Sequence, residues 1–269
     1  MKSKQSHGVS AWRVAKPQAR NVARSKWLLS YTGFFLAATE ALLRFTGGDV
    51  KTLLSLGNVV LFVVPLVTVV YGTVYLYNSR EFIELLLAQP LKRRTVFAGL
   101  YAGLGIPLTG AFVAGVSLPL LLHGYVRGIE GPLATMLAGG AALTLIFTGL
   151  SFCIALRFED RLTGLGVGMA SWLALALVYD GVVLLVVAIL SDHSIEKPLL
   201  AVSLANPIDL VRIALLLQFD ISALMGYTGA VFNRFFSGAI GLAVISAALI
   251  TWIGTPLFLG LRAFGKKDF

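Results

Sequence analysis

Residues that could carry out chemistry or bind a metal are scarce in this sequence. The histidines are His7, His123 and His193, the single cysteine is Cys153, and the four methionines are spread along the chain. A haem or metal centre needs several such ligands within reach of one another. The spacing therefore predicts no metal site and no bound cofactor, and we expect Cys153 to pack as a small apolar residue.

One short pattern is reminiscent of a phosphate-binding loop. Residues Gly260 to Lys267 fit G-x-x-x-x-G-K, but Lys267 stands where a Ser or Thr is needed to hold magnesium. Two residues follow in the sequence, so no helix is expected to present its amino end to a phosphate. The pattern is interpreted as a coincidence, and we expect no ATP site and no enzymatic activity in this chain.

Two ionisable residues fall inside long apolar runs, where an uncompensated charge is costly. Glu40 has Arg44 four residues further on as a natural partner on the same helix face. Asp180 follows Leu162 by about 27 Å of helix, which predicts a position near the outer end of its run. Asp180 either lines a path through the membrane or forms hydrogen bonds among lipid headgroups, and the sequence favours neither.

A second constellation runs from Asn206 to Arg212. Asn206 fits the N-cap of a helix and Pro207 its first position, which puts Asp209 at the third. There the Asp209 carboxylate can return a bond to the cap, and Arg212 can pair with it on the same face. We expect a short amphipathic helix at the outer interface. Its apolar face would carry Ile208, Val211 and Leu215.

The most informative polar stretch covers residues 78–95. Glu81, Glu84 and the apolar residues after them favour a short helix that ends before Pro90. Apolar residues nearly encircle this helix, so something other than water must cover it. The helix either anchors in the inner leaflet of a membrane or inserts into a cytoplasmic partner, with Arg80 helping to orient it.

The elements that position these residues are predicted to be membrane helices. Of 269 residues, 57% are apolar and 13% are charged, whereas about a quarter of the residues in soluble domains are charged. A bilayer core about 30 Å thick takes about 20 helical residues, so the length allows five to seven spans without a sizeable soluble domain. These values exclude a soluble enzyme, a disordered tail and a disulfide scaffold.

The hydropathy pattern predicts an all-α integral membrane protein with six transmembrane helices. The apolar runs cover residues 27–45, 57–77, 96–123, 132–156, 162–190 and 238–264. Alternate segments between them hold 16 of the 22 Lys and Arg residues, which predicts that both termini are cytoplasmic. Since the basic residues flank apolar runs, the net charge of +9 does not indicate a nucleic-acid partner.

The expected organisation has three parts. Residues 1–26 form a cytoplasmic segment with an interfacial helix lying on the anionic lipids of the inner leaflet. Residues 27–264 form the transmembrane domain, including an extracytoplasmic segment at 191–236. Residues 265–269 form a short cytoplasmic tail.

Two motifs carry a resemblance to a known family. Ser79-Arg80-Glu81 and the stretch from Leu85 to Arg93, between the second and third runs, resemble the cytoplasmic coupling region of ABC-2 type permeases. The stretch from Leu204 to Arg212, together with Tyr179-Asp180, resembles the NosY-type permeases of the nitrous oxide reductase maturation system. The resemblance implies a homodimeric permease of the bacterial inner membrane, driven by separate cytoplasmic ATPase subunits. It also implies a periplasmic partner during copper-site assembly.

The resemblance also assigns roles to particular residues. The residues that would dock on the ATPase are Arg80, Glu81, Glu84, Leu85, Gln89, Pro90 and Arg93. The residues of an outer gate or a partner contact would be Asp180, Asn206, Pro207, Asp209 and Arg212. A second interpretation remains open, in which Asp209 and Arg212 only cap and seal their helix. A different class also remains open, that of a non-transporting membrane scaffold or respiratory-complex subunit.

Overall fold

The computed structural model describes residues 11–47, 50–125, 128–189, 202–218 and 238–267. Within these ranges the chain is helical and contains no strand. The helices are α1 (Ala11–Ala23), α2 (Lys26–Thr46), α3 (Val50–Asn78), α4 (Arg80–Leu87), α5 (Arg93–Leu122), α6 (Glu130–Arg157), α7 (Arg161–Leu173), the π-helical turn η1 (Ala174–Val178), α8 (Tyr179–Ile189), α10 (Pro207–Gln218) and α12 (Gly238–Lys266). The all-helical fold predicted from the sequence is confirmed for these residues.

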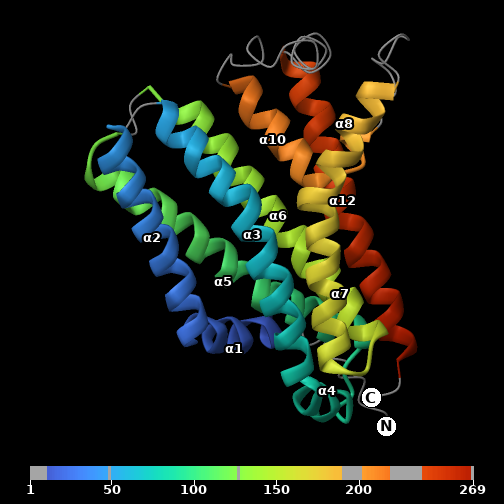
Figure 1. The fold of residues 1–269 in the computed structure, drawn as a ribbon. Coiled ribbons are helices and arrows are strands. Elements are labelled where there is room, and N and C mark those ends of the chain that lie inside the picture. Colours follow the sequence, from blue (N-terminus) through green and yellow to red (C-terminus); the bar gives the residue numbers. More distant parts are fainter. Residues whose placement is uncertain (1–10, 48–49, 126–127, 190–201, 219–237, 268–269) are drawn as a thin grey trace.

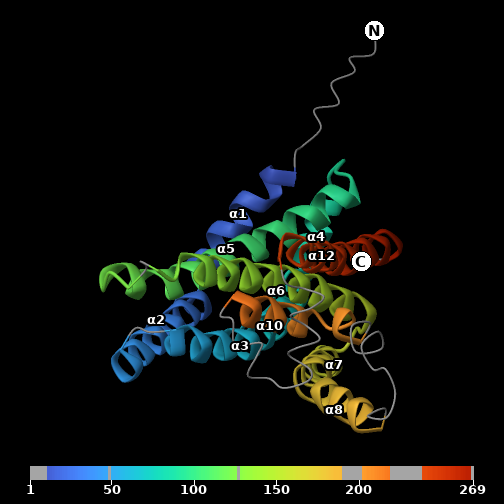
Figure 2. The same ribbon diagram turned by 90° about the horizontal axis from the view of Figure 1, so that it is seen from above.

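The long helices run side by side as a bundle with two distinct ends (Figure 1). The helices α1 and α4 and the carboxyl end of α12 lie at one end, which we call the α4 end. The opposite end is called the far end. Seen along the bundle, α6 lies between α5 on one side and α3 and α10 on the other, while α7, α8 and α12 are peripheral (Figure 2).

Five helical segments are long and apolar enough to cross a membrane. They are Lys51–Asn78, Arg93–Leu122, Glu130–Arg157, Arg161–Leu185 and Gly241–Lys266. These segments match five of the six predicted runs and define a multi-pass membrane protein. The remaining run corresponds to α2, whose 21 residues include Lys26, Glu40 and Arg44 and do not reach the same apolarity. The count of six spans and the cytoplasmic position of both termini remain predictions.

The helix α1 lies across the α4 end and packs on the first turns of α5 (Figure 1). A Cβ atom at Gly99 would lie 2.6 Å from the Cβ of Val14, and one at Gly103 would lie 2.7 Å from the Cβ of Gln18. The two glycines therefore let α1 approach α5 closely within one chain. The side chain of Gln18 also accepts a hydrogen bond of 3.0 Å from the Tyr75 hydroxyl group of α3. The helix predicted in the amino-terminal segment thus covers residues 11–23, while its place at a membrane interface remains a prediction; residues 1–10 lie outside the described ranges.

The buried core lies around α6, whereas the peripheral helices present apolar surface outward. In the most apolar window of α6, 61% of the residues are buried, against 17% in the α7–α8 segment and 11% in α12. Large exposed side chains such as Leu184 and Phe258 lie on these two peripheral segments. An apolar surface of this kind suits lipid or another membrane helix, as the composition predicted.

Candidate functional site

The α4 helix projects at one end of the bundle, between α3 and α5 (Figure 1). Ile83 is fully buried and fixes one face of α4 to the protein. Glu81, Glu84 and Leu85 lie on the opposite, exposed face, where the Leu85 side chain is 68% exposed. The predicted short helix that ends before Pro90 is confirmed. The exposed face has an apolar centre flanked by two carboxylates, which is an arrangement suited to a partner surface.

The amino end of α4 is held by the turn between α6 and α7. The Arg80 guanidinium group donates a hydrogen bond of 3.1 Å to the backbone oxygen of Glu159 and lies 4.7 Å from the centre of the Tyr77 ring. The Tyr77 hydroxyl group donates a hydrogen bond of 2.8 Å to the backbone oxygen of Phe158. A movement of α4 would therefore pull directly on the start of α7.

The segment that follows α4 is held by the carboxyl end of α12. The Arg93 guanidinium group donates hydrogen bonds to the backbone oxygens of Gly265, at 3.2 Å, and Lys267, at 2.7 Å. The Lys267 ammonium group in turn donates a hydrogen bond of 2.8 Å to the backbone oxygen of Leu156, at the end of α6. Partial burial lowers the pKa of Lys267. The ends of α5, α6 and α12 are thus joined beside α4.

The seven residues assigned to ATPase docking fall into two groups. Glu81, Glu84, Leu85, Gln89 and Pro90 are exposed and follow one another along α4 and the turn after it. Arg80 and Arg93 instead direct their guanidinium groups to backbone oxygens of this chain. The first group forms a continuous surface, which we call the α4 surface. The two arginines hold that surface in place.

A second group of polar residues gathers where α8 meets α10. The Arg212 guanidinium group lies 3.0 Å from the Asp180 carboxylate and 2.7 Å from the Asp209 carboxylate. The local pair between Asp209 and Arg212 was expected from their spacing, and it is confirmed. The resemblance grouped Asp180 with them in a candidate gate, but the residue spacing did not predict its contact with Arg212. We call these three residues the ion cluster.

Asn206 joins the ion cluster to the π-helical turn. Its side-chain oxygen accepts a hydrogen bond of 3.0 Å from the backbone N–H of Ile208, so the predicted N-cap is confirmed. Its side-chain nitrogen donates a hydrogen bond of 2.8 Å to the backbone oxygen of Leu175 in η1. A π-helical turn disturbs the regular pairing of backbone groups, and the Asn206 amide supplies a donor there. Pro207 occupies the first helical position and is buried.

The prediction that α10 lies as an amphipathic helix on a surface differs from the structure. Eight of its twelve residues are buried, and the helix packs against α3, α6 and α12 (Figure 2). Besides the predicted apolar face, a second apolar face carries Leu210, Ile213 and Ala214, which pack with Ile245 of α12. A helix that is apolar on two sides is buried rather than laid on a surface.

Two contacts show where α10 begins and ends along the length of the bundle. The Trp252 indole N–H donates a hydrogen bond of 3.2 Å to the backbone oxygen of Leu204, just before α10. Trp252 lies midway along α12, about 21 Å from either end. The carboxyl end of α10 lies near the start of α6, because the Gln218 side chain would be 3.4 Å from a Cβ atom at Gly131. The α10 helix therefore begins near the middle of the bundle and rises to the far end. Most of the predicted extracytoplasmic segment 191–236 lies outside the described residues.

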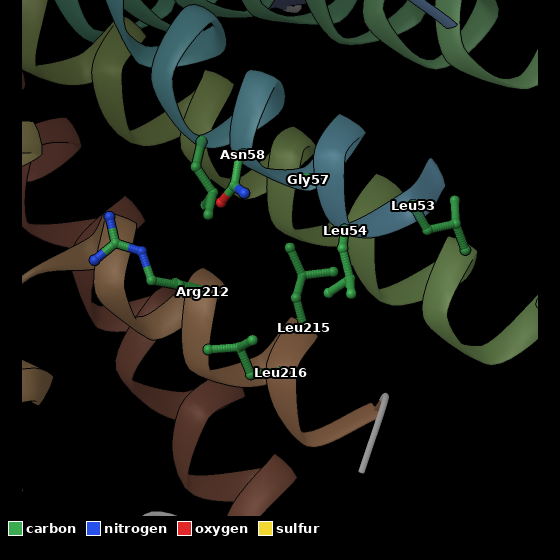
Figure 3. A pocket seen from close by; sticks show the side chains of 8 residues that line it. Leu53, Leu54, Gly57, Asn58, Arg212, Leu215 and Leu216 are labelled. Carbon is green, nitrogen blue, oxygen red and sulfur yellow. The ribbon is translucent and has the colours of Figure 1, made fainter. Parts of the chain in front are cut away.

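A small pocket lies beside the ion cluster, between α3 and α10. Figure 3 shows Leu54 and Asn58 of α3 opposite Arg212 and Leu215 of α10. The pocket has a volume of about 60 Å³, which is enough to hold water next to the guanidinium group. The ion cluster can therefore be hydrated from this side although Asp209 itself is only 7% exposed.

Neither region resembles a metal centre or a nucleotide site. Within the described ranges, no three His, Cys, Asp or Glu residues come together as they would around a metal ion. Residues 260–266 are continuous helix within α12, whereas a phosphate-binding loop would precede its helix. The described residues define a multi-pass helical membrane protein with a projecting short helix at one end and a partly buried charged cluster between α8 and α10.

Comparison with known proteins shows which membrane proteins this chain is similar to. No family model matches the chain. A probable ABC transporter permease protein NosY of Stutzerimonas stutzeri is 25% identical over 275 residues, which cover 95% of this chain and 98% of the relative. The protein of the same name from Pseudomonas aeruginosa is 24% identical over 274 residues, with the same coverage. The resemblance to NosY-type ABC permeases that the two motifs indicated is therefore confirmed, at a distant level.

Proposed function

We propose that this protein is the transmembrane permease subunit of an ATP-driven ABC exporter. The observation that carries the proposal is its similarity, over 95% of its length, to two proteins named as probable ABC transporter permeases. Both alignments cover almost the whole relative, so the comparison concerns the entire helical bundle. ATP hydrolysis then takes place on a separate subunit, and two copies of the permease form a homodimer.

The α4 surface is the proposed contact for the ATPase. Leu85 supplies an exposed apolar anchor, and Glu81 and Glu84 beside it supply charges that fix the orientation of the partner. Because Arg80 and Tyr77 hold α4 against the turn before α7, a pull on α4 is transmitted to the membrane helices. In this proposal the two residues position the surface without touching the ATPase.

The proposed orientation places the α4 end in the cytoplasm of a bacterial inner membrane, with α2 as the sixth span. The distribution of 16 against 6 basic residues supports it, as does α1, whose exposed residues include Arg13, Lys16 and Arg20. The ion cluster then lies between the midplane and the outer surface. There it is a candidate outer gate that α8 and α10 share.

The proposed cellular role is in metalloenzyme maturation, namely the copper site of nitrous oxide reductase, with a periplasmic partner. The name NosY borne by both relatives supports this role, together with the motif from Leu204 to Arg212. The cluster formed by Asp180, Asp209 and Arg212 is the proposed element that responds to this partner or to the cargo.

Purification in mild detergent tests the central proposal. A stoichiometric partner with a Walker motif is the expected result, and the double substitution Glu81→Lys/Glu84→Lys should release it while the permease remains inserted. Arg94→Gln, an exposed change in the next segment, serves as the control and should leave the ATPase bound. Recovery of cofactor-bearing subunits without an ATPase would instead support a scaffold in a respiratory complex.

A further inference from the structure

A cavity of about 490 Å³ lies on the side of the bundle between α2, α3 and α7. Its apolar walls include Leu66, Val67, Val70 and Val74 of α3, with Met169 of α7 on the opposite side. Ligand sites in proteins commonly have volumes of about 300–1,000 Å³. The cavity is therefore large enough for part of an elongated apolar molecule.

The lining of this cavity changes from apolar to polar along α3. Leu66 lies about 18 Å from Asn78 along the helix axis, and Ser79 follows at the polar end. The side-chain oxygen of Asn78 accepts a hydrogen bond of 3.4 Å from the Arg161 guanidinium group, whose side chain is exposed. One end of the cavity is thus apolar, and the other is polar with a cation beside it.

The carboxylates near this polar end interact with other groups of the protein. The Asp160 carboxylate accepts hydrogen bonds from the backbone N–H of Thr163, at 2.7 Å, and from its hydroxyl group, at 2.6 Å. It therefore caps α7 and faces along that helix. The Glu159 carboxylate lies close enough to the Lys267 ammonium group to act on its charge. The exposed cationic residues near this opening are Arg161 and Lys26. Lys26 directly precedes Trp27 in the sequence, and Trp27 is the residue of the two that lines the cavity.

The height of the cavity matches the headgroup layer of the inner leaflet in the proposed orientation. The Ser25 hydroxyl group, just after α1, lies 3.2 Å from the Tyr71 hydroxyl group in the cavity lining. Interfacial helices lie at the boundary of headgroups and acyl chains, and Trp and Tyr side chains favour the same level. The Trp27 and Tyr71 rings are 6.4 Å apart. Residues above Tyr71 then face acyl chains, while Asn78, about 10 Å below it, reaches the phosphate level.

We propose that this cavity binds one anionic phospholipid of the inner leaflet. An acyl chain lies along the walls formed by Val67, Val70 and Met169, and the phosphate lies beside Asn78 and Arg161. The combination of an apolar wall, an aromatic middle and a cationic end fits such an amphiphile along its whole length. The proposal uses the orientation given above but does not depend on transport or on an ATPase.

Lipid retention by the purified full-length protein tests the site. The protein is extracted from nanodiscs of equal parts phosphatidylglycerol and phosphatidylcholine, and the retained lipids are counted by native mass spectrometry. Phosphatidylglycerol should be retained in preference. Arg161→Gln should lower the ratio of the two retained lipids about fivefold, because one basic residue is lost at the phosphate. An equal retention of both lipids by the wild-type protein would overturn the anionic preference.

A pair of matched substitutions tests the location. Val70→Trp fills the cavity and should abolish retention, whereas Val182→Trp, at a position that is 48% exposed on α8, should leave it unchanged. Retention that survives Val70→Trp would overturn the proposal. So would disulfide cross-linking between two copies through cysteines at Val70 and Met169, because the cavity would then be closed by a second chain. The measurement needs no ATPase, so its failure is distinct from a failure of the proposed function.

Discussion

The Arg212 side chain is the one cation that the Asp180 and Asp209 carboxylates share in the ion cluster. It neutralises carboxylates from two different helices, Asp180 at 3.0 Å and Asp209 at 2.7 Å. Losing the shared cation leaves two acids facing each other in an apolar bundle, whereas losing one acid leaves a complete pair. The three residues are therefore unequal in their expected effect on stability.

This inequality can be measured by thermal unfolding in detergent. Arg212→Gln should destabilise the protein by about 2 kcal/mol, less than a fully buried pair would, because the Arg212 side chain is 32% exposed. Asp209→Asn should cost less than Arg212→Gln, and combining both should cost less than the sum. Equal losses for both single variants would show that the cluster does not share charge as described.

Asn206 has two separable roles, and two substitutions distinguish them. Asn206→Asp keeps the acceptor for the N–H of Ile208 but loses the donor to the Leu175 oxygen, while Asn206→Ala loses both. Asn206→Ala should cost about 1 kcal/mol, the usual value of an N-cap. Asn206→Asp should cost more, because it places a carboxylate at a fully buried position beside the Asp209 carboxylate and the Leu175 oxygen. Unfolding midpoints of the two variants give the comparison, and a higher midpoint for Asn206→Asp than for Asn206→Ala would contradict this.

The Asp160 carboxylate caps the amino end of α7, and the stability that this cap provides depends on pH. Hydrogen bonds from the Thr163 hydroxyl group, and then from the Thr163 backbone N–H, lower the pKa of its carboxyl group. The stabilisation is therefore present above the ordinary pKa of Asp and is lost as the pH falls through the lowered value. Thermal unfolding between neutral and acidic pH should show a shallower loss in Asp160→Asn than in the wild type. Parallel curves for the two proteins would contradict this.

At the scale of elements, the residues between α3 and α4 are proposed to transmit movement from the ATPase without binding it. Tyr77→Phe removes the hydrogen bond to the Phe158 oxygen, and Arg80→Gln removes the bond to the Glu159 oxygen, without changing the exposed α4 surface. If the proposed function holds, these variants should retain the ATPase in a pulldown but lose most of its transport-coupled activity. Loss of the ATPase itself from both variants would instead place the two residues in the contact.

Local elements were predictable from the sequence because their signals are local. Each of these signals depends on residues only a few positions apart in the sequence. They are the helix end before Pro90, the N-cap at Asn206, and the ion pairs of Asp209 with Arg212 and of Glu40 with Arg44. The approach of Asp180 to Arg212 joins residues 32 positions apart, and only tertiary packing determines it.

The burial of α10 was missed for a related reason. Its predicted apolar face is real, but Leu210 and Ile213 add a second apolar face that the amphipathic interpretation did not include. The sequence contained this signal, because both residues are apolar. The partners for both faces, α3 and α6 on one side and α12 on the other, could not be known before the fold.

At the scale of the whole molecule, the sidedness of the bundle is the decisive prediction. After Cys153 is replaced, single cysteines at Gln89, beside α4, and at Tyr125, after α5, report the two ends. An impermeant thiol reagent added to intact cells should label the cysteine at Tyr125 and leave the one at Gln89 unmodified. Labelling at Gln89 from outside would reverse the orientation. The predicted outer residue His193 lies outside the described ranges.

The π-helical turn η1 lies between α7 and α8, and it sets which way α8 faces. Compared with a regular helix, such a turn accommodates one extra residue, and each residue of an α-helix turns the chain by about 100°. Removing a single residue, such as Leu177, would restore a regular helix and rotate everything after it by that angle. Asp180 would then face away from Arg212, although no residue of the ion cluster had been altered. In evolutionary terms, a one-residue insertion in a membrane helix is enough to turn a half-exposed carboxylate toward a cation on a neighbouring helix.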